Sequence, residues 1–289
     1  MDKIKILATG LSGMVGSRIF ELLKDKYDFE EISRSTGIDI TDHDAVWEKI
    51  KNTDAQIVLH LAAYTNVDQA EAQKDLKNES EAWKINVNGT QNIADAAKEF
   101  GKKLIYISTD MVFDGNQDTF AKYLENDIAK PANFYGLTKY NGEKIVEDLA
   151  DFLIIRIAYP YRSNFDQKMD YVRIFKKLLS ENKNISAVSD HFFTPTFIDD
   201  LASVIDVLIQ KKQIGIFHAT SGESISPFIA AVKVAEKFNL NKSLISEISK
   251  AEYFKGKAIR GFNLSLNSDK IKQLGVKLHS FEEGLGYII

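Results

Sequence analysis

Short apolar runs alternate with longer amphipathic stretches over the first two thirds of the chain. The runs at 4–8, 56–61, 103–108 and 152–157 are brief and rich in Ile, Val or Leu, so they predict buried strands, and a further strand is expected at 29–33. The amphipathic stretches at 14–26, 44–51, 81–100 and 137–149 predict helices. This alternation predicts βαβ units and an α/β fold of Rossmann type, with a doubly wound parallel sheet.

The last third of the chain is less regular. Strands are expected at 184–188, 214–219 and 243–249, and helices at 199–211, 227–238 and 268–274. No internal repeat, low-complexity run or Pro/Gly-rich linker separates the two parts. We therefore expect a larger domain over 1–158, with returning segments near 190–220, and a smaller, interwoven C-terminal lobe over 159–289.

Composition and charge exclude several classes of protein. The 289 residues include no cysteine, which excludes disulfides, Cys-ligated metals and a cysteine nucleophile. A net charge of −4 lacks the basic footprint of a nucleic-acid-binding protein. No apolar run approaches the ~18–20 residues of a membrane span, and the first residues lead directly into a strand. The five histidines are scattered, so no metal site is expected. We expect a cytoplasmic protein without a membrane or nucleic-acid partner.

A glycine-rich loop joins the first expected strand to the first expected helix. Gly10, Gly13 and Gly16 allow a tight turn, a close approach of a pyrophosphate to the backbone, and packing of helix on strand. The helix N-terminus then offers free N–H groups to that anion. The loop lacks the Lys-Ser/Thr ending of a nucleoside triphosphate loop. It predicts that 1–158 binds a dinucleotide and that 159–289 mainly binds the substrate.

The residues after the second strand bear on the choice between NAD and NADP. Arg34 follows this strand where a carboxylate would favour NAD, and its guanidinium suits a 2′-phosphate. A solvated surface arginine is the alternative reading. Asp39 is the nearest candidate for a ribose or adenine contact. The expected cofactor is NADPH or NADH, with NADP favoured.

Three further residues predict carbonyl reduction. Thr109 ends the fourth expected strand, at the sheet edge where ligands bind. Tyr135 and Lys139 stand four residues apart, on one face of the next helix. A nearby ammonium favours the phenolate and lowers the pKa of the phenol towards working pH, while a hydroxyl on the strand holds the carbonyl oxygen.

With these motifs in place, the chain resembles the extended short-chain dehydrogenase/reductases, most closely their dTDP-4-dehydrorhamnose reductase branch. The likeness covers almost the whole chain and runs through the glycine loop, 39–42, 60–68, 86–90, 108–115, 131–136 and 194–196. The resemblance implies a reduced nicotinamide cofactor and the C4 ketone of a nucleotide-linked 6-deoxy sugar as substrate. A homodimer is a candidate assembly.

The resemblance also implies roles for residues of this sequence. Thr109, Tyr135 and Lys139 would be catalytic. The expected cofactor contacts are Gly10, Ser12, Gly13, Met14, Val15, Gly16, Arg34, Asp39, Ile40, Leu61, Ala62, Ala63, Tyr64, Asn86, Tyr135 and Lys139. The expected substrate contacts are Thr65, Val67, Asp110, Met111 and Tyr159.

Departures from the family pattern keep two alternatives open. The family usually has Tyr where this chain has Met111 and Trp where it has Tyr159, and Phe193 also departs from the usual motif. One alternative is therefore a non-catalytic, cofactor-binding regulatory subunit, resembling the beta subunit of methionine adenosyltransferase. The other is a nucleotide-sugar epimerase. A dehydratase is disfavoured because Met111 replaces the Glu that such enzymes usually carry after the aspartate.

Overall fold

A parallel sheet forms the centre of the molecule. The computed structural model describes residues 3–163, 165 and 167–288, and within them six strands pair in the order β2-β1-β3-β4-β5-β7. The strands are β1 Ile4–Thr9, β2 Tyr27–Ile32, β3 Ile57–His60, β4 Lys103–Thr109, β5 Phe152–Ile157 and β7 Gly215–His218. The chain moves outward from β1 to β2 and then crosses to β3 on the other side. This reversal opens a crevice at the carboxyl ends of β1 and β3, and it confirms the predicted doubly wound fold.

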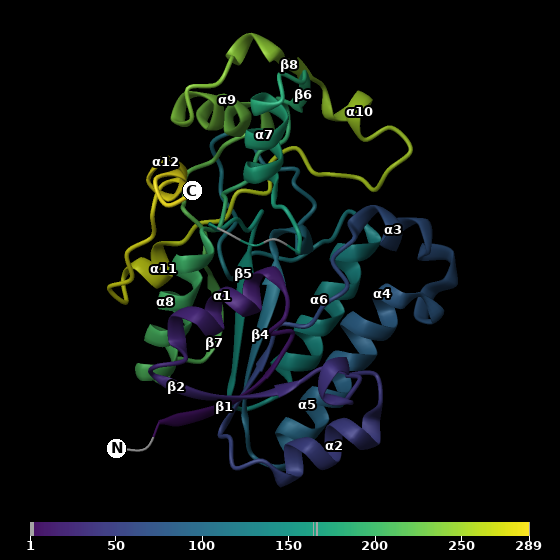
Figure 1. Cartoon of the computed structure of the whole chain (residues 1–289). Helices are drawn as coiled ribbons and strands as arrows, with labels where there is room; N and C mark the ends of the chain where they lie inside the picture. Colours follow the sequence, from purple (N-terminus) through teal and green to yellow (C-terminus); the bar gives the residue numbers. More distant parts are fainter. Residues whose placement is uncertain (1–2, 164, 166, 289) are drawn as a thin grey trace.

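Helices cover both faces of this sheet (Figure 1). One face packs against α1 Met14–Leu23 and α8 Ile198–Gln210, and the other against α2 His43–Asn52, α5 Thr90–Glu99 and α6 Phe134–Glu147. Successive strand residues alternate between the two layers, because side chains on a strand point to opposite faces. Ile6 belongs to the core beneath α1 and α8, whereas Leu7 belongs to the core beneath α2 and α5.

A smaller lobe lies over one end of the sheet. Its two strands, β6 Ile185–Val188 and β8 Ile245–Ile248, pair in parallel, and α7 Tyr171–Ser180 and α9 Pro227–Lys237 pack beside them (Figure 1). The short helices are α3 Val67–Ala72, α4 Glu81–Trp83, α10 Lys250–Tyr253, α11 Asp269–Lys272 and α12 Phe281–Leu285. After β6 the chain leaves the lobe, and α8 leads it back into the main sheet as β7. The division at residue 158 stays a prediction.

The expected helix at 81–100 is interrupted. A π-helical turn, Lys84–Gly89, separates α4 from α5, and Asn86 lies within it. The Asn86 amide accepts a bond from the backbone N–H of Tyr64 at 2.8 Å and donates to the hydroxyl of Thr138 at 2.9 Å. These bonds connect the loop after β3 with α6, which explains why the regular helical ladder is broken there.

The helix expected at 137–149 begins earlier, at Phe134. The side chain of Asn133 caps it by accepting a bond from the N–H of Gly136 at 2.8 Å. Tyr135 therefore stands in the first helical turn, close to the carboxyl end of β4.

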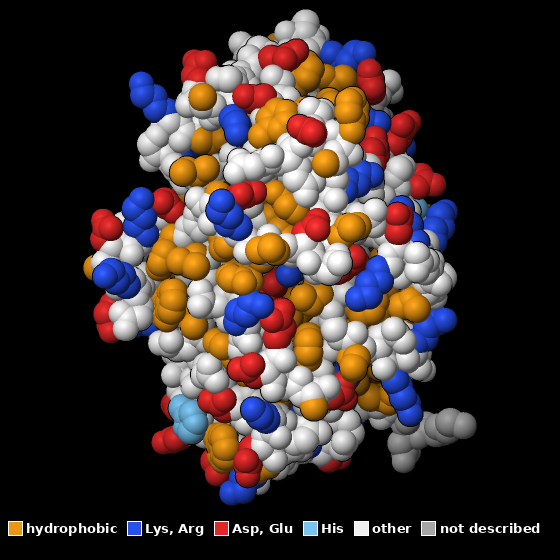
Figure 2. Space-filling view, turned by 180° about the vertical axis from the view of Figure 1, so that it is seen from behind, with side chains coloured by type: hydrophobic (Ala, Val, Ile, Leu, Met, Phe, Trp, Pro, Cys, Tyr) orange, Lys and Arg blue, Asp and Glu red, His pale blue; other side chains and the backbone are white. Residues whose placement is uncertain are grey.

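Charged side chains of both signs are interspersed over the face of the molecule shown in Figure 2, with hydrophobic side chains between them. That face shows no basic stripe of the kind that a phosphate backbone requires. In the described part of the chain, no helix is both long and apolar enough to span a bilayer.

Candidate active site

A large cavity opens at the carboxyl ends of the strands, where doubly wound sheets bind ligands. Its volume is about 840 Å³, which is within the range of small-molecule sites. Its walls come from the loop after β1, the end of β2, the loop after β3, the end of β4, the start of α6 and the segments after β5. Residues far apart in sequence therefore meet around one space.

The glycine loop forms one end of this cavity. A Cβ on Gly16 would lie 2.2 Å from the carbonyl oxygen of Gly10, so only glycine fits there. Gly10 itself has φ +72°, a conformation that favours glycine. The N-terminus of α1 has no side-chain cap and no acidic residue in its first turn, whereas side chains cap α2, α6, α7 and α9. Its uncapped N–H groups suit a pyrophosphate, so the loop fits the expected dinucleotide.

Arg34 and Asp39 face each other beside the end of β2. The Nε of Arg34 donates to Oδ2 of Asp39 at 2.7 Å, and both residues line the cavity. A backbone hydrogen bond from Thr41 lowers the pKa of Asp39, and the guanidinium of Arg34 contributes in the same direction. The hydroxyls of Ser33 and Ser35 stand on the same wall, 2.7 Å apart.

The three predicted catalytic side chains meet on the cavity wall. Thr109 ends β4, while Tyr135 and Lys139 come from consecutive turns of α6. Burial and the charge of Asp110 raise the pKa of Tyr135, and the hydroxyl of Thr109 acts against them. This corrects the expectation of a lowered pKa. The phenol keeps its proton at neutral pH, as an acid that protonates an alkoxide must.

Lys139 is buried and is held by two groups of the preceding strand. Its Nζ donates to the carbonyl oxygen of Ile107 at 2.8 Å and lies 3.9 Å from the ring centre of Tyr106. Burial lowers the pKa of Lys139 to about 7, and the charge of Glu143 acts against this. Lys139 is not among the groups that shift the pKa of Tyr135, which burial dominates, so the lowering expected from the sequence is not found.

Asp110 presents an unusual carboxyl group to the cavity. It is almost completely buried, its Oδ1 accepts a bond from the Thr109 hydroxyl at 2.9 Å, and its Oδ2 has no partner among the described residues. Burial raises the pKa of Asp110 to about 7. A buried, unpaired carboxyl oxygen in a cavity is a ready ligand for a substrate hydroxyl.

His60, at the end of β3, is a core residue. Its Nδ1 lies 2.7 Å from the hydroxyl of Thr9 and its Nε2 lies 3.1 Å from that of Thr90. Burial lowers the pKa of His60 to about 3, so the ring is neutral and satisfied.

The cavity brings together most of the residues singled out in the sequence. Those on its wall are Gly10, Ser12, Gly13, Met14, Val15, Gly16, Arg34, Asp39, Ile40, Leu61, Ala62, Ala63, Thr65, Val67, Thr109, Asp110, Met111, Tyr135, Lys139 and Tyr159. Among the described residues, Tyr64 and Asn86 do not line it; they buttress α6 instead, through the bonds around Thr138. Their cofactor role stays a prediction.

Sequence reasoning missed another part of the wall. Lys168, Met169, Asp170 and Tyr171 close the cavity from the lobe. They come from a stretch without a motif, although the apolar periodicity of α7 was a signal that a helix begins there.

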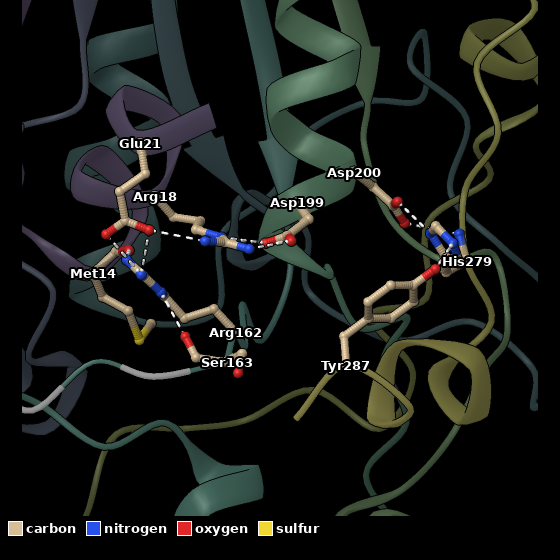
Figure 3. A network of polar contacts seen from close by, with 9 residues as sticks. All are labelled: Met14, Arg18, Glu21, Arg162, Ser163, Asp199, Asp200, His279 and Tyr287. Carbon is tan, nitrogen blue, oxygen red and sulfur yellow. Dashed lines mark hydrogen bonds and ion pairs between the residues drawn. The ribbon is translucent and has the colours of Figure 1, made fainter. Parts of the chain in front are cut away.

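A network of charged side chains holds the segment around Arg162 against α1 (Figure 3). Arg162 is nearly fully buried and donates to the carbonyl oxygen of Met14, to the hydroxyl of Ser17 at 2.8 Å and to Glu21 at 2.9 Å. Arg18 bonds the same carboxylate at 2.9 Å and reaches Asp199 of α8 at 2.6 Å. The network therefore connects α1 with the chain that leads into the lobe.

Comparison with known proteins assigns the chain to a family. The family model "RmlD substrate binding domain" matches residues 4–289. A dTDP-4-dehydrorhamnose reductase of Aggregatibacter actinomycetemcomitans is 30% identical, over 97% of both chains. Methionine adenosyltransferase 2 subunit beta of Mus musculus is also 30% identical, over 94% of this chain and 83% of its own. The crystal structure of dTDP-4-dehydrorhamnose reductase from Bacillus anthracis in complex with NADP superposes with a TM-score of 0.89 at 31% identity, over 99% and 98% of the two chains. The chain belongs to the RmlD substrate-binding-domain family of the extended short-chain dehydrogenase/reductases.

Proposed function

We propose that this protein is an NADPH-dependent reductase of a nucleotide-linked 4-keto-6-deoxy sugar. The observation that carries the proposal is the meeting of Thr109, Tyr135 and Lys139 on the wall of one cavity that also contains the glycine loop. The names of similar proteins point to the same reaction, since dTDP-4-dehydrorhamnose reductases match nearly the whole chain.

Each residue then has a defined task. When bound, the reduced nicotinamide supplies a hydride to the carbonyl carbon. Tyr135 gives its phenolic proton to the carbonyl oxygen, so the ketone becomes an alcohol and the proton is replaced from solvent. Thr109 turns its single hydroxyl hydrogen from Oδ1 of Asp110 to the same oxygen and orients it. Lys139 binds the ribose and provides positive charge beside the phenol. The unpaired oxygen of Asp110 accepts a hydrogen bond from a sugar hydroxyl.

The position of Arg34 supports NADPH as the preferred cofactor. Its guanidinium stands at the cavity edge beside the hydroxyls of Ser33 and Ser35, a set of donors that suits a 2′-phosphate.

The proposal places the enzyme in the cytoplasm, where reduced nicotinamide and activated sugars coexist. A homodimer stays part of the proposal on the strength of the resemblance alone, and light scattering at several protein concentrations tests it.

The proposal is tested with a panel of keto-sugar nucleotides. Purified protein is mixed with NADPH or NADH and each candidate, and loss of the reduced-nicotinamide absorbance is followed. We expect turnover with dTDP-4-keto-6-deoxy sugars, and faster turnover with NADPH than with NADH. Absence of oxidation across the panel, by protein that binds the cofactor, would contradict the proposal.

A second candidate function follows from one observation. Methionine adenosyltransferase 2 subunit beta of Mus musculus matches this chain at 30% identity, as the Aggregatibacter reductase does, although over 83% rather than 97% of its own length. A cofactor-binding regulator is therefore the competing hypothesis. The complete set of Thr109, Tyr135 and Lys139 favours the enzyme, because a binder has no need of an acid. Co-purification of this chain with a methionine adenosyltransferase, together with silence in the keto-sugar panel, would favour the regulator.

A further inference from the structure

Tyr159 has a strained backbone on the cavity wall. Its φ is +42°, a left-handed conformation that costs a non-glycine residue energy, and Pro160 follows it, which disfavours that conformation further. Among the described residues, the other non-glycine positive φ values belong to Lys77, at a kink within a 3-10 helix, and to Asn182, Lys212 and Asn239, which lie in turns. A bulky residue keeps such strain only where its surroundings enforce it, often at a functional site.

His191 enforces the orientation of the Tyr159 ring. The imidazole lies 2.7 Å through Nδ1 from the carbonyl oxygen of Gly261, and 2.8 Å through Nε2 from the hydroxyl of Tyr159. A carbonyl oxygen only accepts, so Nδ1 carries the hydrogen and Nε2 accepts the hydroxyl proton of Tyr159. Burial lowers the pKa of His191 to about 4, so this tautomer is neutral at working pH.

Aromatic rings complete the support. The ring of Tyr159 stacks on that of Phe193, with 3.8 Å between centroids and 19° between planes. Tyr171 meets it edge to face at 5.8 Å. One hydrogen bond and two ring contacts therefore fix a side chain that the backbone alone would not place there.

Tyr159 lines the cavity, whereas His191 does not line it in the part of the chain that the structure describes. Tyr159 shares the cavity wall with Asp110 and Met111, and the charge of Asp110 acts on its phenol. His191 is fully buried and is not among the lining residues that the structure describes. Any effect of His191 on the substrate must therefore pass through Tyr159.

We infer that His191 is a positioning residue for the nucleotide-sugar, because it holds the Tyr159 ring as the wall against which the substrate is aligned beside Asp110. This inference rests on the proposed reductase function and adds to it a residue that determines substrate affinity without touching the substrate. The cofactor, which enters at the glycine loop, does not depend on it.

Three variants test the inference. His191→Leu removes both hydrogen bonds, Tyr159→Phe removes only the hydroxyl, and His191→Gln retains an acceptor for Tyr159 and a donor for Gly261. We expect the first two to raise the KM for the nucleotide-sugar about five- to twentyfold, the range expected for one lost hydrogen bond in a buried site. We expect kcat and the KM for NADPH to stay within about twofold, and His191→Gln to recover most of the substrate affinity.

A second tyrosine–histidine pair supplies matched controls. Tyr287 and His279 lie 3.5 Å apart near the C-terminus, away from the cavity, where His279 also bonds Asp200 (Figure 3). Tyr287→Phe and His279→Leu are expected to change stability while leaving the KM for the sugar unchanged.

The outcomes separate the inference from the proposed function. Unchanged KM for the sugar in folded His191→Leu and Tyr159→Phe would overturn the inference, and so would an equal rise in the KM for NADPH. If His191→Leu does not fold, Tyr159→Phe alone decides between these results. Failure of the wild-type protein to reduce any nucleotide-sugar would instead overturn the proposed function.

Discussion

The Nε of Arg34 lies 2.7 Å from Oδ2 of Asp39 at the edge of the cavity. At this place in a doubly wound fold, a carboxylate binds the ribose 2′-hydroxyl of NAD and an arginine binds the 2′-phosphate of NADP. This chain carries both groups and pairs them with each other. Asp39 bonds only the Nε of Arg34, so the terminal N–H groups can meet a 2′-phosphate, which the charge of Asp39 repels.

The pair predicts how cofactor choice changes on substitution. Arg34→Ala removes a charged donor to the 2′-phosphate, so the KM for NADPH rises about tenfold or more, while the KM for NADH stays within about twofold. Asp39→Asn frees the guanidinium and lowers the KM for NADPH. Steady-state kinetics with both cofactors measure these effects, with the surface variant Lys26→Ala as control. Equal losses for NADPH and NADH would show that Arg34 does not read the phosphate.

Tyr135 is expected to be the acid. Tyr135→Phe removes the proton donor but keeps the ring, so kcat falls about 100-fold or more, the usual contribution of general acid catalysis. Binding of NADPH, followed by fluorescence titration, is expected to change less than about threefold. Tyr140→Phe on the same helix is the matched control and is expected to keep its activity. Substantial turnover by Tyr135→Phe would remove the phenol from its assigned role.

Asp110 makes the stability of the protein depend on pH. Its folded pKa of about 7 lies above the ordinary value of 3.8, because burial disfavours the charged form. The unfolded chain therefore loses this proton first, and stability falls as pH rises from about 4 to 7. Asn does not titrate, so Asp110→Asn lacks this pH dependence. The free energy of unfolding of the variant, relative to that of the wild type, is therefore expected to be about 2–3 kcal/mol higher at about pH 8 than at about pH 5.

Urea unfolding at the two pH values measures this difference. Asp114→Asn is the control, because hydrogen bonds and Lys130 lower the pKa of Asp114 against the effect of burial. The Asp114 carboxyl is ionised above about pH 5 in both the folded and the unfolded protein. The change in free energy of unfolding that Asp114→Asn causes is therefore expected to be the same at both pH values. An equally flat response for Asp110→Asn would show that the Asp110 carboxyl is ionised in the folded protein.

Glu21 balances the buried charge of Arg162. The side chain of Arg162 is only 2% exposed, and Glu21 is its carboxylate partner. Glu21→Gln removes the counter-charge that the described residues give this guanidinium and is expected to lower the free energy of unfolding by about 1–3 kcal/mol. The control is Glu48→Gln, since Glu48 forms only an exposed pair with Lys51 and its loss costs under about 0.5 kcal/mol. Equal stability losses in the two variants would contradict this account of the network.

Local patterns predicted the main sheet and the cofactor end of the site. The strands β1, β3, β4 and β5 are short apolar runs, and the glycine loop is contiguous in sequence, so both are visible without tertiary information. Thr109, Tyr135 and Lys139 were found because a strand end and a helix start are adjacent in a βαβ unit.

The other features depend on contacts between distant segments. The bond between Tyr159 and His191 spans 32 positions, and the bond from His191 to Gly261 spans 70. The π-helical turn around Asn86 arises from bonds to Tyr64 and Thr138, which no helical periodicity encodes. The raised pKa of Tyr135 likewise results from burial, and the spacing of Tyr135 and Lys139 alone suggested the opposite direction.

The central claim is that the site transfers a hydride to a sugar ketone while Tyr135 supplies the proton. It is tested most directly with NADPH that carries deuterium at C4 of the nicotinamide and a dTDP-4-keto-6-deoxy sugar, with the product examined by mass spectrometry and NMR. The account predicts one deuterium at C4 of the product sugar for each NADPH oxidised. A product without deuterium, or sugar conversion without net oxidation of NADPH, would contradict it.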